Sequence, residues 1–274
     1  MSKDNKRKIV VIAGGWHFPV HFYEEMIKQE IPKNWEVDYF CISHRNPDLD
    51  IVRKEKEKIL NEYCMDDNNI LNRLDHLLYR KSINKEEIKN LGWSYIEKPN
   101  IMGDFYFVNQ WAEEINYEDY DAILLSHDDN FIFQYGIFTE GVMQFNWDDW
   151  LTIANGVAAS NEDFHFRGSF AIFKTELIKL MGGAFEVDNV TLNRVGKVDT
   201  PKSHSDLKDW NNIGGNFGRF VKDNNLTNKV KRFSDTYRIS KFCMEGERGF
   251  LSKGGSDKMF GIFKYLENNF NMVK

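Results

Sequence analysis

Short, almost uninterrupted apolar runs recur along the first half of this chain, separated by charged or helix-like segments. The runs lie at residues 8–13, 35–43, 93–97 and 121–126. Each is far shorter than the roughly 20 apolar residues of a membrane span but has the length of a β-strand. Because helix-like segments separate the strands, we expect parallel pairing in an α/β fold with a Rossmann-like mixed sheet flanked by helices.

In the second half of the chain, strand-like and helix-like segments alternate less regularly. We expect helices at residues 21–30, 106–115, 175–181 and 217–222, and a short strand at 170–173. The helix that ends before Gly182-Gly183 has a typical glycine stop signal.

Length and composition favour one elaborated domain over residues 1–274. Apolar residues make up 42% of the chain and aromatic residues 15%, which is enough for a large core. No internal repeat or Ser/Pro-rich linker divides the chain. We expect a helical insertion at about residues 50–92 and a C-terminal elaboration at about 222–274.

Charge and cysteine content exclude several classes of protein. A formal net charge of −6 and a pI near 5.7 disfavour broad nucleic-acid binding, so a nucleic-acid acceptor stays open but is not favoured. The cysteines at 41, 64 and 243 fit neither a disulfide framework nor a Cys-x-x-Cys zinc site. Without a signal-like leader or a membrane-length apolar run, we expect a cytoplasmic protein.

Polar clusters follow three of the expected strands directly, where open α/β sheets bind their ligands. Adjacent carboxylates after a buried strand suit Mg²⁺ or Mn²⁺, which takes one or two carboxylates together with phosphate oxygens. A solvated turn is the alternative, since Asp and Asn favour turns. The clusters are Gly14-Gly15-Trp16-His17, Ser43-His44-Arg45-Asn46 and Ser126-His127-Asp128-Asp129-Asn130.

Other candidate residues have both a functional and a structural interpretation. Gly14 and Gly15 could admit a phosphate or base, or could form a tight strand-to-helix turn. Arg45 could pair with phosphate or a uracil edge, or be an ordinary surface arginine. Trp147 and Trp150 could stack acceptor sugar rings, or pack in the core. Rossmann dinucleotide, Walker and Gly-x-Ser-x-Gly motifs do not occur.

Taken in order, four segments resemble a GT-A-fold nucleotide-sugar glycosyltransferase of the family-2-like type. They cover about residues 8–220. They are the opening strand and helix, the segment from Glu97 to Asp104 with the later Asn109, the strand that ends in Ser126-His127-Asp128-Asp129, and the stretch from Gly168 to Glu186 that includes Met181-Gly182-Gly183-Ala184-Phe185-Glu186. His127 stands where the family has the first aspartate of its Asp-x-Asp motif.

The resemblance implies roles for individual residues. It implies a metal site at Asp129 with His127, and Mn²⁺ or Mg²⁺ as the cofactor. It also implies an acidic catalytic base downstream, for which Asp209 is the first choice and Asp206 the second. Together with the candidates weighed above, the expected donor-binding set is Gly14, Gly15, Arg45, Gly103, Asp104, Asn109 and Asp128, and the expected acceptor set is Trp147 and Trp150.

The expected enzyme is therefore a glycosyltransferase that moves a sugar from a nucleotide-diphosphate sugar to an acceptor hydroxyl with metal assistance and inversion. The acceptor would be a glycan, a lipid-linked sugar or another hydroxyl compound. Two alternatives stay open, a nucleotidyltransferase that makes nucleotide sugars and a non-catalytic carbohydrate-binding protein. The residues do not fix the donor sugar, the stereochemistry or the oligomeric state.

Overall fold

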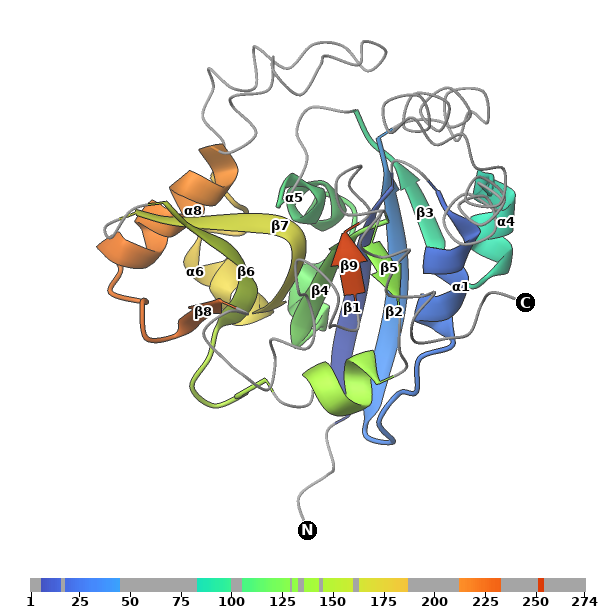
Figure 1. The fold of residues 1–274 in the computed structure, drawn as a ribbon, viewed down its shortest axis with the longest axis horizontal. Helices are drawn as coiled ribbons and strands as arrows, with labels where there is room; N and C mark the ends of the chain where they lie inside the picture. The colour runs from blue at the N-terminus through green and yellow to red at the C-terminus, as the bar shows by residue number, and fades with distance from the viewer. Residues whose placement is uncertain are drawn as a thin grey trace, which may run out of the picture.

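A computed structural model describes residues 6–15, 18–44, 83–99, 105–128, 130–132, 136–142, 145–159, 163–186, 212–232 and 251–253. Within them a seven-stranded mixed sheet forms the centre of the molecule (Figure 1). Its strands are, in spatial order, β3 (Ser94–Glu97), β2 (Trp35–Ser43), β1 (Arg7–Gly15), β4 (Ala122–His127), β7 (Asp163–Lys174), β6 (Thr152–Ala159) and β8 (Val230–Arg232).

The pairing divides this sheet into a parallel part and a mixed part. β1 pairs in parallel with β2 and β4, and β2 pairs in parallel with β3. β7 is antiparallel to both β4 and β6, while β8 is parallel to β6. The expected α/β class with a Rossmann-like mixed sheet is confirmed.

Helices cover both faces of the sheet (Figure 1). On β1, alternate side chains enter two different core clusters: Ile9 and Val11 join one, and Val10 and Ile12 join the other. Burial on both faces explains why the strand reads as a continuous apolar run. The helices, including one-turn 3-10 and π segments, are α1 (Val20–Ile27), α4 (Lys85–Asn90), α5 (Tyr106–Ala112), η1 (Tyr117–Asp119), η2 (Ile137–Gly141), α6 (Thr175–Leu180) and α8 (Asn212–Asp223).

Each face has its own helices. The first cluster takes side chains from α1 and α4, such as Phe22, Met26 and Ile88. The second cluster takes side chains from α5, α6 and α8, such as Trp111 and Leu177. None of the helices in the described ranges is long and apolar enough to cross a membrane.

The expected strands and helices of the first half agree closely with these elements. The run at 35–43 is β2, and the runs at 8–13, 93–97 and 121–126 differ from β1, β3 and β4 by one or two residues at their ends. The strand at 170–173 was too short, because β7 starts seven residues earlier. Of the helices expected within 50–92, only α4 lies in the described residues.

A second, two-stranded ladder joins distant parts of the chain. β5 (Asn130–Ile132) pairs in antiparallel fashion with β9 (Leu251–Lys253), so that Asn130 lies opposite Lys253. Residues 251–253, within the expected C-terminal elaboration, therefore lie beside the chain immediately after the His-Asp-Asp cluster. No pattern in the sequence indicates this pairing.

Candidate functional site

The ends of β1, β2 and β4 meet at one edge of the sheet, and they carry the three polar clusters. In the ladder, Gly14 lies opposite His127, and Gly15 lies opposite Ser43. Just beyond the strands, the Asp128 N–H donates to the Gly14 carbonyl oxygen at 3.1 Å. The edge thus brings together residues more than a hundred positions apart, as the parallel pairing predicts.

Gly14 and Gly15 are required by the packing of neighbouring side chains. A Cβ at Gly14 would lie 2.5 Å from the Phe107 ring. A Cβ at Gly15 would lie 2.8 Å from both the Cys41 sulfur and the Phe18 ring. The absence of side chains at these two positions is therefore explained by protein packing, and donor binding by Gly14 and Gly15 stays a prediction.

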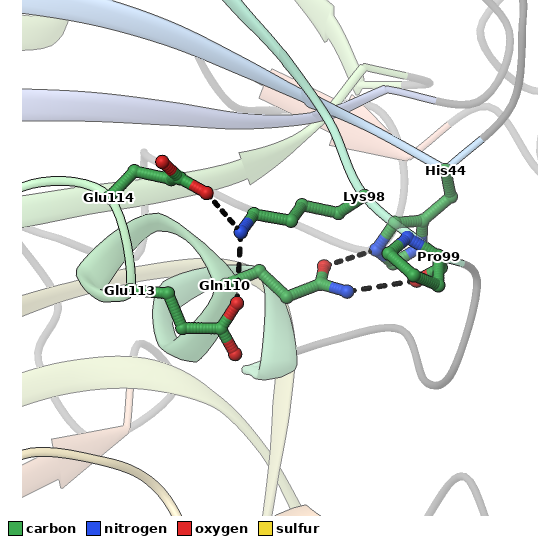
Figure 2. Close-up of polar contacts among 6 residues, drawn as sticks. All are labelled: His44, Lys98, Pro99, Gln110, Glu113 and Glu114. Carbon is green, nitrogen blue, oxygen red and sulfur yellow. Dashed lines mark hydrogen bonds and ion pairs between the residues drawn. The ribbon is translucent and has the colours of Figure 1, made fainter.

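His44 is a buried imidazole that stacks on Phe107, with ring centroids 4.2 Å apart and an interplanar angle of 19°. Its Nε2 hydrogen-bonds Gln110 Oε1, and Gln110 Nε2 donates to the Pro99 carbonyl oxygen at 2.8 Å (Figure 2). Because the bond to Pro99 orients the Gln110 amide, His44 Nε2 is the donor. Burial lowers the pKa of His44 to about 4; the hydrogen bond with Gln110 raises it and the neighbouring His127 lowers it by smaller amounts, so His44 is neutral at pH 7.

Lys98, which precedes Pro99, extends to two carboxylates just after α5 (Figure 2). Its backbone N–H donates to the Ser43 carbonyl oxygen, and its ammonium lies 2.9 Å from Glu113 and 2.6 Å from Glu114. Burial lowers the pKa of Lys98, but the hydrogen bonds to the two carboxylates outweigh burial and the net pKa is raised. Lys98 therefore stays charged, and it ties the end of β3 to the end of α5.

Asn109, predicted to bind the donor, forms a two-bond clamp on the backbone of Phe185. Its Nδ2 donates to the Phe185 carbonyl oxygen and its Oδ1 accepts from the Phe185 N–H, both at 2.8 Å. The Phe185 ring stacks on Phe105 at 4.8 Å and contacts Phe217 of α8 at 5.3 Å. Asn109 thus joins α5 to the turn after α6, and a donor contact by this residue stays a prediction.

His127 and Asp128 close the edge at the end of β4. The His127 ring lies edge-to-face with Phe107 at 5.7 Å. The Asp128 carboxylate is buried, and its Oδ2 accepts from the Phe18 N–H at 2.7 Å and from the Tyr23 hydroxyl at 3.3 Å. Across the described ranges, no group of three or more His, Cys, Asp or Glu side chains could hold a metal ion.

Several predicted site residues lie outside the described residues. They are Arg45, Gly103, Asp104, Asp129, Asp206 and Asp209. Their neighbours in the chain are placed, however. Pro99 and Phe105 flank the segment with Gly103 and Asp104, and Asn216 of α8 donates to the Glu186 carbonyl oxygen at 3.2 Å.

Trp147 and Trp150 lie away from this edge. The guanidinium of Arg7 lies 3.8 Å from the centre of the Trp147 ring, which also meets Trp35 edge-to-face at 5.8 Å. Arg7 and Trp35 are the first residues of β1 and β2, about 25 Å from the carboxyl edge at the usual rise per residue. Both tryptophans pack against the core and against Phe145, and an acceptor contact by either residue stays a prediction.

Comparison with known proteins gives remote structural likenesses. No protein-family model and no curated protein matches the sequence. Among solved structures, the mannosyltransferase PcManGT from Pyrobaculum calidifontis in complex with GDP-Man and Mn²⁺ is 10% identical with a TM-score of 0.43, and the alignment covers 84% of this chain and 55% of that one. Residues 1–349 of S. aureus TarS are 13% identical with a TM-score of 0.43, covering 94% of this chain and 63% of that one.

A nucleotidyltransferase shows a similar degree of likeness. A cytidylyltransferase from Leptospira borgpetersenii is 12% identical with a TM-score of 0.39, and the alignment covers 82% of this chain and 74% of that one. The chain spans less than two thirds of the mannosyltransferase and of TarS. The likenesses are to glycosyltransferases and nucleotidyltransferases alike.

Sequence reasoning did not single out three residues that build the edge, namely Phe107, Gln110 and Tyr23. For Phe107 and Gln110 the sequence does hold an indication, because they lie three residues apart in an expected helix and so share one face of it. No signal in the sequence joins Tyr23 to Asp128, because 105 positions separate them.

Proposed function

We propose that this chain is a glycosyltransferase that binds a nucleotide-diphosphate sugar at the carboxyl edge of β1, β2 and β4. The observation that carries the proposal is the convergence of the three polar clusters at this edge, with Gly14 opposite His127 and Gly15 opposite Ser43. Open α/β sheets bind ligands outside the carboxyl ends of their strands. The order of the four family-like segments in the sequence supports a sugar nucleotide as the ligand.

The proposed metal site contains Asp129, with His127 assisting. A divalent ion in such a site takes one or two protein carboxylates and completes its shell with phosphate oxygens and water, so a cluster of three protein ligands is not needed. The hydrogen bonds to Asp128 favour Asp129 as the carboxylate of the pair that meets the ion. When bound, Mn²⁺ or Mg²⁺ supplies positive charge to the departing diphosphate.

The proposed base is Asp209, with Asp206 as second choice. Inverting transfer needs a carboxylate that takes the proton of the acceptor hydroxyl on the face opposite the leaving group. His44 is a poor candidate for that role because it is 2% exposed and its Nε2 proton is held by Gln110. Asp206 and Asp209 lie in the chain between Glu186 and Asn216. The side chain of Asn216 donates a hydrogen bond to the Glu186 carbonyl oxygen, so these two flanking residues are in contact.

Donor binding tests the metal assignment. UDP-glucose and GDP-mannose are titrated calorimetrically into wild type, Asp129→Ala and the control Asp148→Ala, each with Mn²⁺ and with EDTA. Asp148 is an exposed acid beside Trp147, away from the donor edge. We expect Mn²⁺ to strengthen donor binding in wild type and Asp148→Ala but not in Asp129→Ala. Equal affinities with and without Mn²⁺ in wild type would remove the metal role.

Turnover tests the base and separates the alternative enzyme. Asp209→Asn is expected to lose about 10²-fold or more in sugar transfer while its donor affinity stays unchanged. Unchanged turnover would contradict the assignment of Asp209. Release of pyrophosphate from a nucleoside triphosphate and a sugar phosphate would favour the nucleotidyltransferase.

A further inference from the structure

The two adjacent aspartates at the end of β4 are candidates for different tasks. Asp128 is 1% exposed, and its Oδ2 accepts hydrogen bonds from the Phe18 N–H at 2.7 Å and the Tyr23 hydroxyl at 3.3 Å. Both donors belong to the turn and helix that follow β1. The Asp128 backbone is also tied to β1, through its N–H and the Gly14 carbonyl oxygen.

Phe18 occupies a backbone conformation that needs support. Its φ of 54° is in the left-handed region, which residues other than glycine rarely adopt. The Phe18 ring is fully buried, and its carbonyl oxygen accepts from the Ile83 N–H at 2.9 Å. The Phe18 N–H donates to Asp128, so both backbone polar groups of Phe18 are hydrogen-bonded and its side chain is buried. The end of the β1–α1 turn is therefore fixed relative to β4.

Tyr23 completes the support of the carboxylate. Burial raises the pKa of the Tyr23 hydroxyl, and the neighbouring Cys41 and Asp128 raise it further, so the hydroxyl keeps its proton and donates. The Tyr23 ring is held edge-to-face by Phe22 at 5.4 Å and Trp93 at 5.1 Å. A buried carboxylate is stable only when such donors replace its lost water.

We propose that Asp128 is a positioning residue, which fixes the β1–α1 turn against the end of β4, and that it is a ligand of neither the metal nor the donor. This inference rests on the proposed function, because the turn matters for activity only if the donor binds at this edge. Of the two adjacent aspartates, Asp128 would then be the positioning residue and Asp129 the metal-binding residue.

The experiment compares Asp128→Asn, Asp128→Ala and Asp129→Asn. Asparagine keeps an oxygen that accepts the Phe18 N–H but lacks the charge that a divalent ion requires. For position 128 we expect the asparagine variant to keep Mn²⁺-dependent UDP or GDP binding within about threefold of wild type and the alanine variant to lose about tenfold, with and without Mn²⁺. For Asp129→Asn we expect the Mn²⁺ dependence itself to disappear.

A second measurement does not depend on any ligand. Hydrogen exchange at the Phe18 amide is expected to accelerate at least about tenfold in Asp128→Ala and to stay near the wild-type rate in Asp128→Asn. If the alanine variant does not fold, Tyr23→Phe replaces it. We then expect faster exchange at Phe18 and weaker nucleotide binding, with an unchanged ratio of affinities with and without Mn²⁺.

The outcomes separate this inference from the proposed function. Loss of Mn²⁺-dependent binding in a folded Asp128→Asn protein would make Asp128 a metal ligand and overturn the inference. Unchanged exchange at Phe18 in both Asp128→Ala and Tyr23→Phe would also overturn it. If wild type binds no nucleotide while the exchange pattern follows expectation, the positioning of the turn stands and the proposed function fails.

Discussion

Replacing Gly14 by alanine tests whether Phe107 fills the space beside the end of β1. The added Cβ would lie 2.5, 2.7 and 2.8 Å from three atoms of the Phe107 ring, whereas carbon atoms in contact are normally about 3.5–4.0 Å apart. The ring would have to move by roughly 1 Å. It has little room, because it is 5% exposed and lies between His44 and His127.

The expected cost follows from overpacking. Inserting a methyl group into a well-packed core costs about 1–3 kcal/mol. Replacing glycine in a strand returns about 0.5–1 kcal/mol through backbone entropy, which leaves a net loss of up to about 2.5 kcal/mol, centred near 1 kcal/mol. In a chain of this size, a loss of about 1 kcal/mol lowers Tm by about 2–4 °C.

A double-mutant cycle with Phe107→Leu assigns the cost to this contact. Leucine lacks the outer ring atoms that the new Cβ would meet, so Gly14→Ala should cost little in the Phe107→Leu background. The measurement is urea unfolding of the four proteins followed by circular dichroism. We expect a coupling free energy of about 1–2 kcal/mol. Additive effects, or a Gly14→Ala protein as stable as wild type, would refute the packing argument.

Three further perturbations have definite expected results. Asn109→Ala leaves the buried N–H and C=O of Phe185 unpaired and should lower the free energy of unfolding by about 2–4 kcal/mol in urea titrations; a loss below 1 kcal/mol would contradict the clamp. The folded-state pKa of His44, about 4, is below its ordinary value of 6.5, so its contribution to stability is present above pH 6.5 and is lost as pH falls toward 4. Wild type should therefore lose about 3 kcal/mol relative to His44→Gln over that window, and parallel stability curves of the two proteins would disprove this. Trp147→Ala should lower the free energy of unfolding by about 1–3 kcal/mol in urea titrations, through lost contacts with Arg7 and Trp35; stability equal to that of wild type would contradict this packing.

The parallel part of the fold was predictable because its two central strands, β1 and β4, are buried on both faces. Burial on both faces makes β1 and β4 continuous apolar runs, and the intervening helices dictate parallel pairing. β6 and β7 were harder to predict because they are antiparallel, and their register shifts between Ala154 and Asn155. The pairing of β5 with β9 joins positions more than 115 residues apart, and no local pattern encodes it.

The edge that carries the candidate site was predictable, but the task of each side chain was not. Strand ends follow from the apolar pattern, so the meeting of Gly14, Ser43 and His127 follows from parallel pairing. The orientation of the Asp128 carboxylate depends on Phe18 and Tyr23, which are 110 and 105 positions away. Likewise, a glycine at position 14 is compatible with a ligand or with the Phe107 ring in the space beside it, and the sequence alone does not distinguish the two.

Helix α5 connects these observations, because three of its residues contact different segments of the chain. Phe107 packs against Gly14, Asn109 clamps Phe185, and Gln110 bonds His44 and Pro99. Seven residues are too few for an independently stable helix, so these contacts must themselves hold α5 in place. A change that displaces α5 at Phe107 should therefore loosen the Phe185 turn as well. Hydrogen exchange at the Phe185 amide in Gly14→Ala measures this coupling, and wild-type exchange there would show that the two contacts are independent.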